Sequence, residues 1–131
     1  MKKFVLTVLV CLILIIPSAN AEIFKDNEGF SYIVNPNYLI FTMGNKFCST
    51  LDLSSIRIIV NNNSRFEFNA IDLVIRYNDE SIVRRGITNF REDYRTGNIY
   101  VDGDLIDKYI TGYDKNSREI YYKMKSAALS R

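Results

Sequence analysis

The stretch RFEFNAIDLVIRY, residues 65–77, decides the fold, because it reads as one long β-strand whose apolar positions change side. Its first half places Phe66, Phe68 and Ala70 on one face. Ile71, Leu73, Ile75 and Tyr77 in its second half stand at odd-numbered positions and therefore share the opposite face. Side chains of a strand alternate with a period of two, so we expect a β-bulge or a sharp bend where the side changes. The alternative is a strand that is buried on both sides between two layers.

Short segments of the same kind lie on both sides of this strand. The chain is rich in Ile, Val, Tyr and Phe, which fit a half-buried pleated surface, and turn residues separate the apolar runs. We expect an antiparallel meander of about six to eight strands, mainly β in class, with a β-dominated α+β fold as the alternative. Besides residues 65–77, the expected strands are Phe30–Val34, Tyr38–Met43, Ser55–Val60, Ser81–Tyr94, Ile99–Val101, Leu105–Tyr113 and Glu119–Met124.

The last third of the chain contains a hairpin signal and an ambiguous end. Asp102-Gly103 is a preferred two-residue hairpin turn, because both residue types tolerate positive φ. Since side chains alternate along a strand, the expected strand Glu119–Met124 buries Tyr122 and leaves Tyr121 outside. The segment Ser126–Leu129 either forms a short C-terminal helix or frays.

The first 21 residues have the layout of a secretory signal peptide. Two lysines precede an apolar run over residues 4–16, and Ala19-Asn20-Ala21 supplies the small residues before a signal peptidase cut. The run is shorter than the ~20 residues that span a membrane. Cleavage is therefore the expectation, and an uncleaved anchor, which would be the chain's only membrane contact, is the alternative. We expect residues 22–131 to be one antiparallel β domain, exported to the periplasm, the cell surface or the medium.

Removal of the signal peptide changes the charge and the cysteine count. Lys2 and Lys3 leave with it, so 15 of the 17 basic residues remain against 15 acidic ones, and the net charge falls from +2 to zero. A neutral chain argues against nucleic acid as the partner, because phosphate binding needs a net basic face. Cys48 becomes the single cysteine. It is either a buried free thiol, or a thiol that reacts or forms an intermolecular disulfide.

Composition also narrows the chemistry. The chain has no His and no glycine-rich phosphate loop, which removes Ser-His-Asp and Cys-His catalysis and the common nucleotide sites. The usual zinc, copper and iron–sulfur sites lack their ligands. Glu92 and Asp93 cannot act as a catalytic pair with each other, since neighbours on a strand point to opposite faces. We expect no catalytic residue, no cofactor and no metal.

Tyrosine is the residue type that most suggests a binding function. The sequence has nine Tyr, and six of them crowd its C-terminal part. A row of exposed Tyr on a sheet suits protein binding, because each ring offers area and a polar tip together; the alternative is that the rings cover a small core. An Arg pair either binds an anion or guards an edge strand against pairing. The candidate protein-binding residues are Tyr94, Tyr100, Tyr109, Tyr113, Tyr121, Arg84 and Arg85.

Three motifs resemble the small exported bacterial proteins related to surface-adhesin protein E. Leu51–Ile56 is similar to that family's Asp-x-x-Ser-Ile start of a strand, and Arg95–Tyr100 is similar to its central strand. Tyr113–Tyr121 resembles its Tyr-Asp hairpin, with Ser117 in place of Gly. The family's Trp residues and Cys pair are missing. The resemblance implies an antiparallel sheet with a helix packed on it; adhesion to host proteins is known for some members, and no binding residue carries over.

These observations together predict an exported, non-enzymatic binding module of the bacterial envelope or surface, adhesin-like, whose partner is an envelope or host protein. Two other functions stay open. An inhibitor of a lytic enzyme, or an envelope stress protein, would use a projecting loop such as Asn61–Asn63. A carboxylate-based hydrolase would need two acids facing each other in a cleft. The sequence does not indicate an oligomeric state.

Overall fold

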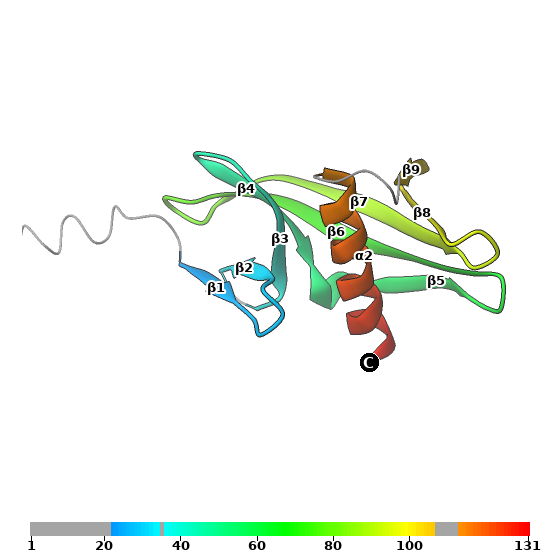
Figure 1. The fold of residues 1–131 in the computed structure, drawn as a ribbon. Helices are drawn as coiled ribbons and strands as arrows, with labels where there is room; N and C mark the ends of the chain where they lie inside the picture. The colour runs from blue at the N-terminus through cyan, green and yellow to red at the C-terminus, as the bar shows by residue number, and fades with distance from the viewer. Residues whose placement is uncertain (1–21, 35, 107–112) are drawn as a thin grey trace, which may run out of the picture.

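A nine-stranded antiparallel sheet carries a long C-terminal helix on one face (Figure 1). The computed structural model describes residues 22–34, 36–106 and 113–131, and the expected signal peptide lies outside this part of the chain. The elements are β1 (Ile23–Lys25), β2 (Ser31–Ile33), β3 (Tyr38–Met43), β4 (Phe47–Asp52), the short 3-10 helix η2 (Leu53–Ser55), β5 (Arg57–Asn61), β6 (Arg65–Arg76), β7 (Ile82–Asp93), β8 (Asn98–Val101), β9 (Asp104–Ile106) and α2 (Tyr113–Leu129).

The strand order confirms the expected antiparallel meander. Neighbouring strands follow the order β1-β2-β3-β4-β6-β7-β8-β9, and β5 pairs with the first part of β6. The expected strand Tyr38–Met43 is β3. The segment Ser81–Tyr94, expected as one long or broken strand, is the continuous β7. The Asp102-Gly103 turn joins β8 to β9 with φ of 50° and 85°, the two positive values that this hairpin type requires.

Strand β6 belongs to two separate cores, one on each side of the sheet. Phe66 and Phe68 in its first half pack against α2, and the Phe68 and Tyr121 rings stack with centroids 5.9 Å apart. Leu73 and Ile75 in its second half lie in a second core with side chains of β2, β3 and β4. In Figure 1, β3 runs across the direction of β6, so this end of the sheet is strongly bent.

The change of buried side along β6 needs no bulge at that point. Pairing of β6 with β7 runs through Ala70 and Ile71 without a shift, so the expected bulge there is wrong; the shift lies between Val74 and Ile75. What changes over residues 70–72 is the strand on the other edge of β6, because β5 ends and β4 begins. Each half of β6 is therefore buried on one side only. The alternative expectation, a strand buried on both sides, is also wrong.

Helix α2 replaces the expected final strand. Ile120, Tyr121, Met124 and Ala128 are buried, a spacing that follows the 3.6-residue period of a helix. Tyr121 is 0% exposed and Tyr122 is 45% exposed, so the expected placement of these two rings is reversed. The alternation of Ile120, Tyr122 and Met124 suggested a strand, but the burial that α2 gains against Phe68 and Phe90 outweighs this local pattern.

The chain before α2 also differs from expectation. β9 covers only the start of the expected strand Leu105–Tyr113; residues 107–112 lie outside the described residues, and Tyr113 begins the helix. β1 and β4 were not among the expected strands. β1 is exposed and pairs with β2, whereas β4 pairs with β3 and β6 and buries side chains in both cores. These are tertiary contributions that local composition does not report.

A charged cluster fastens the β1–β2 hairpin to α2. The Tyr32 hydroxyl donates to Asp26 at 2.7 Å, and the Lys123 ammonium lies 3.0 Å from the same carboxylate and 2.9 Å from Glu28. Burial alone would raise the pKa of Asp26. The hydrogen bonds from Tyr32, Lys123 and the amides of Phe30 and Glu28 outweigh it and lower the pKa to about 2.

The Asp26 cluster predicts a loss of stability in acid. Since the folded-state pKa of Asp26 is about 2 and the unfolded value is about 3.9, its stabilisation is complete above pH 4 and fades as the pH falls toward 2. Asp26→Asn should therefore lower the urea midpoint at pH 6 by more than it does at pH 2. Asp104→Asn, in the exposed start of β9, is the matched control. A difference between wild type and Asp26→Asn that stays constant with pH would contradict this role.

Candidate functional site

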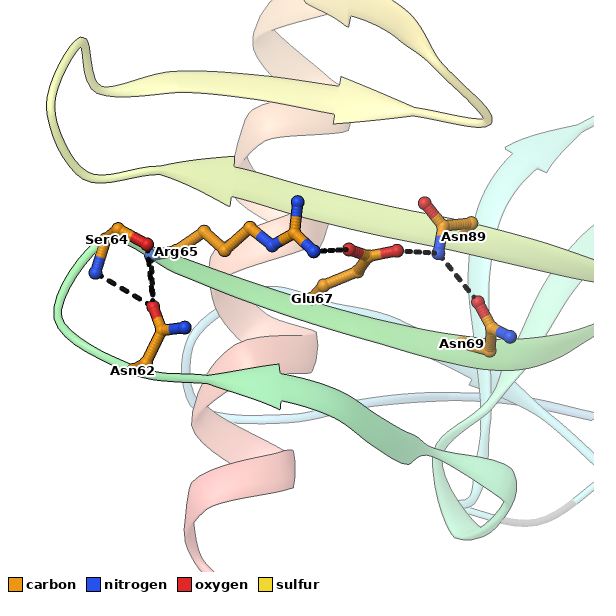
Figure 2. A network of polar contacts seen from close by, with 6 residues as sticks. All are labelled: Asn62, Ser64, Arg65, Glu67, Asn69 and Asn89. Atoms are coloured by element: carbon orange, nitrogen blue, oxygen red, sulfur yellow. Dashed lines mark hydrogen bonds and ion pairs between the residues drawn. The ribbon is translucent and has the colours of Figure 1, made fainter.

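The side of β6, β7 and β8 that faces away from α2 is polar, and no element of the described residues covers it. Directly paired residues point to the same face of a sheet. Phe68 pairs with Phe90 on the helix side, so the residues before and after them point to the opposite side. Figure 2 looks onto this opposite side, with α2 behind the sheet. We call this surface the open face.

A row of hydrogen-bonded side chains crosses the open face (Figure 2). The side-chain amide of Asn89 donates to the Asn69 side chain at 2.8 Å and to Glu67 at 3.0 Å. The Arg65 guanidinium lies 3.8 Å from the Glu67 carboxylate. On β7 and β8, the guanidinium carbon of Arg91 lies 4.4 Å from the centroid of the Tyr100 ring, a cation–π contact. We call these side chains the polar ladder; they are Arg65, Glu67, Asn69, Asn89, Arg91 and Tyr100. Their mutual contacts fix them in place without a ligand.

One end of the polar ladder borders a shallow hollow of about 360 Å³. Three guanidinium groups, those of Arg65, Arg91 and Arg95, line it together with Tyr100, and Asp93 is its one carboxylate. Asp93 already accepts a hydrogen bond from the amide of Arg95 at 2.9 Å. Among the described residues, no carboxylate lies within 4.0 Å of the Arg91 or Arg95 side chain. The hollow, which we call the arginine pocket, is locally basic although the net charge after the expected cleavage is zero.

The structure does not gather the candidate tyrosines into one row. Tyr100 lies on the open face, whereas the Tyr94 ring is 4.7 Å from the Lys125 ammonium on the helix side. Tyr121 is buried and cannot belong to a binding surface, so that candidate is wrong. Tyr109 lies outside the described residues, and the structure describes only the backbone of Tyr113.

The residues that sequence reasoning missed are the polar positions between the buried ones. Arg65, Glu67 and Asn69 alternate with Phe66 and Phe68 along β6, and β7 repeats the pattern. The alternation itself marked these positions as facing away from the core. Their cross-strand partners were not predictable, because a partner depends on the register of β6 with β7.

The buried carboxylate of Glu92 in the sheet is paired with side chains of α2. Glu92 accepts hydrogen bonds from the Tyr121 hydroxyl at 2.7 Å and from the Lys125 ammonium at 2.8 Å. Burial raises the pKa of Tyr121, and the hydrogen bond to Glu92 raises it further. Burial would lower the pKa of Lys125, but its contacts with Glu92 and Tyr94 raise it. Asp93 pairs with Arg65 on the opposite face, so Glu92 and Asp93 point apart as expected.

Two other acids, Asp72 and Asp102, border one hollow on the helix side, beside residues 84–88 of β7. The Thr88 hydroxyl donates to the Asp72 carboxylate at 2.8 Å, and the backbone amide of Asn89 donates to the Asp102 carboxylate at 2.8 Å. A Cβ on Gly86 would lie 3.0 Å from the Asp72 carboxylate, so glycine leaves the space that this carboxylate fills. A carboxylate-based hydrolase needs two acids at one hollow, and each of these two already has a structural partner.

The Arg84 and Arg85 side chains are exposed, on the part of β7 that extends beyond β8. The Asn61–Asn63 turn is ordered by its own hydrogen bonds, because the Asn62 side chain accepts from the Ser64 amide and hydroxyl and from the Arg65 amide. Figure 2 shows this turn next to the polar ladder.

Cys48 is a free, buried thiol in the second core. It is 1% exposed, and burial raises its pKa to about 11. A thiol with a raised pKa and no access to solvent is a poor nucleophile. The structure therefore favours the buried thiol over the reactive or intermolecular one.

Comparisons with known proteins add no identity to this geometry. No family model, characterised protein or solved structure matches the chain. The resemblance to surface-adhesin protein E therefore stays a prediction. Within the described ranges, no three potential metal-ligating side chains cluster. The helix found there is too short or too polar to cross a bilayer.

The contact between Tyr121 and Glu92 predicts a specific loss of stability. Tyr121→Phe keeps the ring stack but removes the hydroxyl that donates to a buried carboxylate, which should lower the free energy of unfolding by about 1.5–3 kcal/mol. Tyr122→Phe, on the exposed side of α2, should change it by less than about 0.5 kcal/mol. Urea denaturation measures both variants. Equal effects would show that the buried hydrogen bond contributes nothing.

The burial of Cys48 predicts slow chemistry. In a Cys11→Ser background Cys48 is the single thiol, and an aromatic disulfide reagent should label it about a hundredfold more slowly in the native protein than in urea. Absorbance of the released thiolate measures the rate. Rapid native labelling, or a disulfide-linked dimer on a non-reducing gel, would show instead that the thiol is accessible.

Proposed function

We propose that this chain is an exported, non-enzymatic protein-binding module of the bacterial envelope or surface, and that it binds its partner through the open face. The observation that carries this proposal is the arginine pocket at the end of the polar ladder, on the side of the sheet that α2 leaves uncovered. An adhesin-like role, with an envelope or host protein as the partner, fits this surface.

The polar ladder is suited to binding because its side chains are ordered before a partner arrives. Asn69, Asn89 and Glu67 hold one another through hydrogen bonds, and Arg91 is stacked on Tyr100. A preordered surface loses less side-chain entropy on binding than a set of free side chains does. Arg and Tyr are also the residues that most often dominate the energy of protein interfaces.

The charge of the arginine pocket indicates what the partner presents there. Arg91 and Arg95 have unneutralised guanidinium groups, and a guanidinium binds a carboxylate with two parallel hydrogen bonds. The partner is therefore expected to place Asp or Glu side chains over this end of the open face. Electrostatic complementarity of this kind sets orientation and the association rate.

Two further features support the parts of the proposal that concern export and chemistry. Lysines, an apolar run and Ala19-Asn20-Ala21 give the first 21 residues the layout of a cleaved signal peptide. Glu92, the one buried carboxylate among the described residues, is paired with Lys125 and Tyr121, so it supports a structural rather than a catalytic role.

The proposal predicts position-specific cross-linking. A photo-reactive amino acid placed at Tyr100, in cells that produce the full chain, should join the protein to one discrete partner, and the same group at Tyr122 on α2 should not. Arg91→Ala with Arg95→Ala should reduce the cross-linked yield about tenfold, because interface arginines are frequent hot spots. Lys25→Ala, in exposed β1, is the charge-removal control.

Gel shift and mass spectrometry of the cross-linked species read out this experiment. If positions 100 and 122 give the same pattern, or if the double arginine variant keeps its full yield, the open face is not the binding surface.

A further inference from the structure

Strand β7 is paired on both sides over only part of its length. β6 runs along it from Ile82 to Asp93, but β8 pairs only with the four residues from Phe90 onward. The backbone of Asn89 is hydrogen-bonded to Asp102. From Thr88 back to Ile82, no strand of the described residues pairs with the edge of β7 opposite β6. Figure 1 shows β7 extending past the end of β8. We call residues 82–88 the free β7 edge.

The backbone of the free β7 edge presents unpaired hydrogen-bonding groups. The backbone amide of Asn89 donates to the Asp102 side chain, and the backbone carbonyl of Asn89 accepts from the backbone amide of Asp102, each at 2.8 Å. Both groups of Asn89 therefore point away from β6. Because this direction alternates along an antiparallel strand, the N–H and C=O groups of Ile87 and Arg85 also point outward. This is the arrangement that an added strand requires.

The side chains of this edge are both apolar and basic. Ile87 is 69% exposed and lies on the side away from α2, together with its pairing partner Ile71. Arg85 lies on that same side, and in the described part of the chain no carboxylate lies within 4.0 Å of it. A charged guard against edge pairing accounts for the arginines but not for an isoleucine exposed to this extent.

Charge indicates what can pair with this edge. Two copies of the chain that paired antiparallel through its middle would bring Arg84 and Arg85 of one copy against those of the other, and like charges in direct opposition are destabilising. A segment with an acidic residue opposite Arg85 would instead form an attractive cross-strand charge pair. On the helix side, the Asp72 carboxylate next to Gly86 disfavours a second acid. The acid therefore belongs on the side away from α2.

We propose that the free β7 edge takes up an extended segment of a partner protein as an added antiparallel strand. The segment carries an acidic residue opposite Arg85 and, two residues away on the same face, an apolar residue opposite Ile87. Its backbone exchanges hydrogen bonds with Arg85 and Ile87. This inference rests on the proposed function in that both treat the chain as a protein-binding module, but it uses the free β7 edge and not the arginine pocket.

A synthetic peptide, Thr-Val-Thr-Glu-Thr-Val-Thr with capped ends, tests the proposal on the purified protein. Its Glu has an apolar residue two positions away on either side, so it meets the pattern in either direction. Peptide titration followed by NMR should move the resonances of Arg85 and Ile87 and slow the hydrogen exchange of their amides. Replacement of the Glu by Lys should weaken binding about tenfold or more.

Two controls separate strand addition from simple charge attraction. The same peptide N-methylated at the Glu and both Val residues keeps its charge but loses the donors that face β7, so it should not bind. On the protein, Ile87→Pro removes one outward donor while leaving the β6–β7 ladder intact, and should weaken binding about tenfold. Ile87→Thr keeps that donor and should weaken binding by less. Circular dichroism confirms that both variants fold.

Several results would overturn the inference. These are equal binding of the N-methylated peptide, no binding at millimolar peptide, or resonance shifts at Arg91 and Tyr100 in place of the edge. A dimer in sedimentation that Ile87→Pro abolishes would show that a second copy occupies the edge instead.

The outcome is separable from that of the proposed function. Arg91→Ala with Arg95→Ala should leave the affinity for the peptide unchanged, because these residues lie next to β8, beyond the free β7 edge. If the peptide fails but cross-links from position 100 persist, only the edge inference is lost. If the peptide binds and those cross-links are absent, the open face is lost as the binding surface.

Discussion

The structure depends on one strand that buries opposite faces in its two halves. The first half of β6 turns Phe66 and Phe68 toward α2, and the second half turns Leu73 and Ile75 the other way. Because side chains alternate, burial of Phe66 and Phe68 on the helix side leaves Glu67 and Asn69 on the opposite side. The polar ladder is thus the direct counterpart of the helix core, and the open face exists because the second core begins only farther along the strand.

Much of the sheet could be predicted from its residues, and the reasons are local. β3 is a run of mainly β-branched and aromatic residues bounded by turns, and β7 has such residues before and after Arg84-Arg85-Gly86. Asp102-Gly103 supports a hairpin by its own conformational preferences. Helix α2 could not be predicted in this way, since its residues fit a period of two nearly as well as a period of 3.6. The choice between Tyr121 and Tyr122 as the buried ring is made by Phe68, Phe90 and the Glu92 carboxylate, which are distant in sequence.

The candidate site shows the same division between local and distant information. Tyr100, Arg84 and Arg85 were singled out by residue type, and all three lie at surfaces used in the proposals. The arginine pocket could not be predicted, because it joins residues from β6, β7 and the turn before β8 through the register of the sheet. A chain with no net charge after the expected cleavage can still carry a basic surface. Strand pairing brings arginines together there, while an acid such as Glu92 is buried on the helix side and paired with Lys125.

A strand that lies in both cores also couples them energetically. The β6–β7 ladder supports the helix-side core at one end and the second core at the other, and both strands must be in place for either core to be closed. Loss of packing on one side therefore weakens the strand pairing on which the other side depends. The two cores behave as one cooperative unit, and neither can open without a cost to the other.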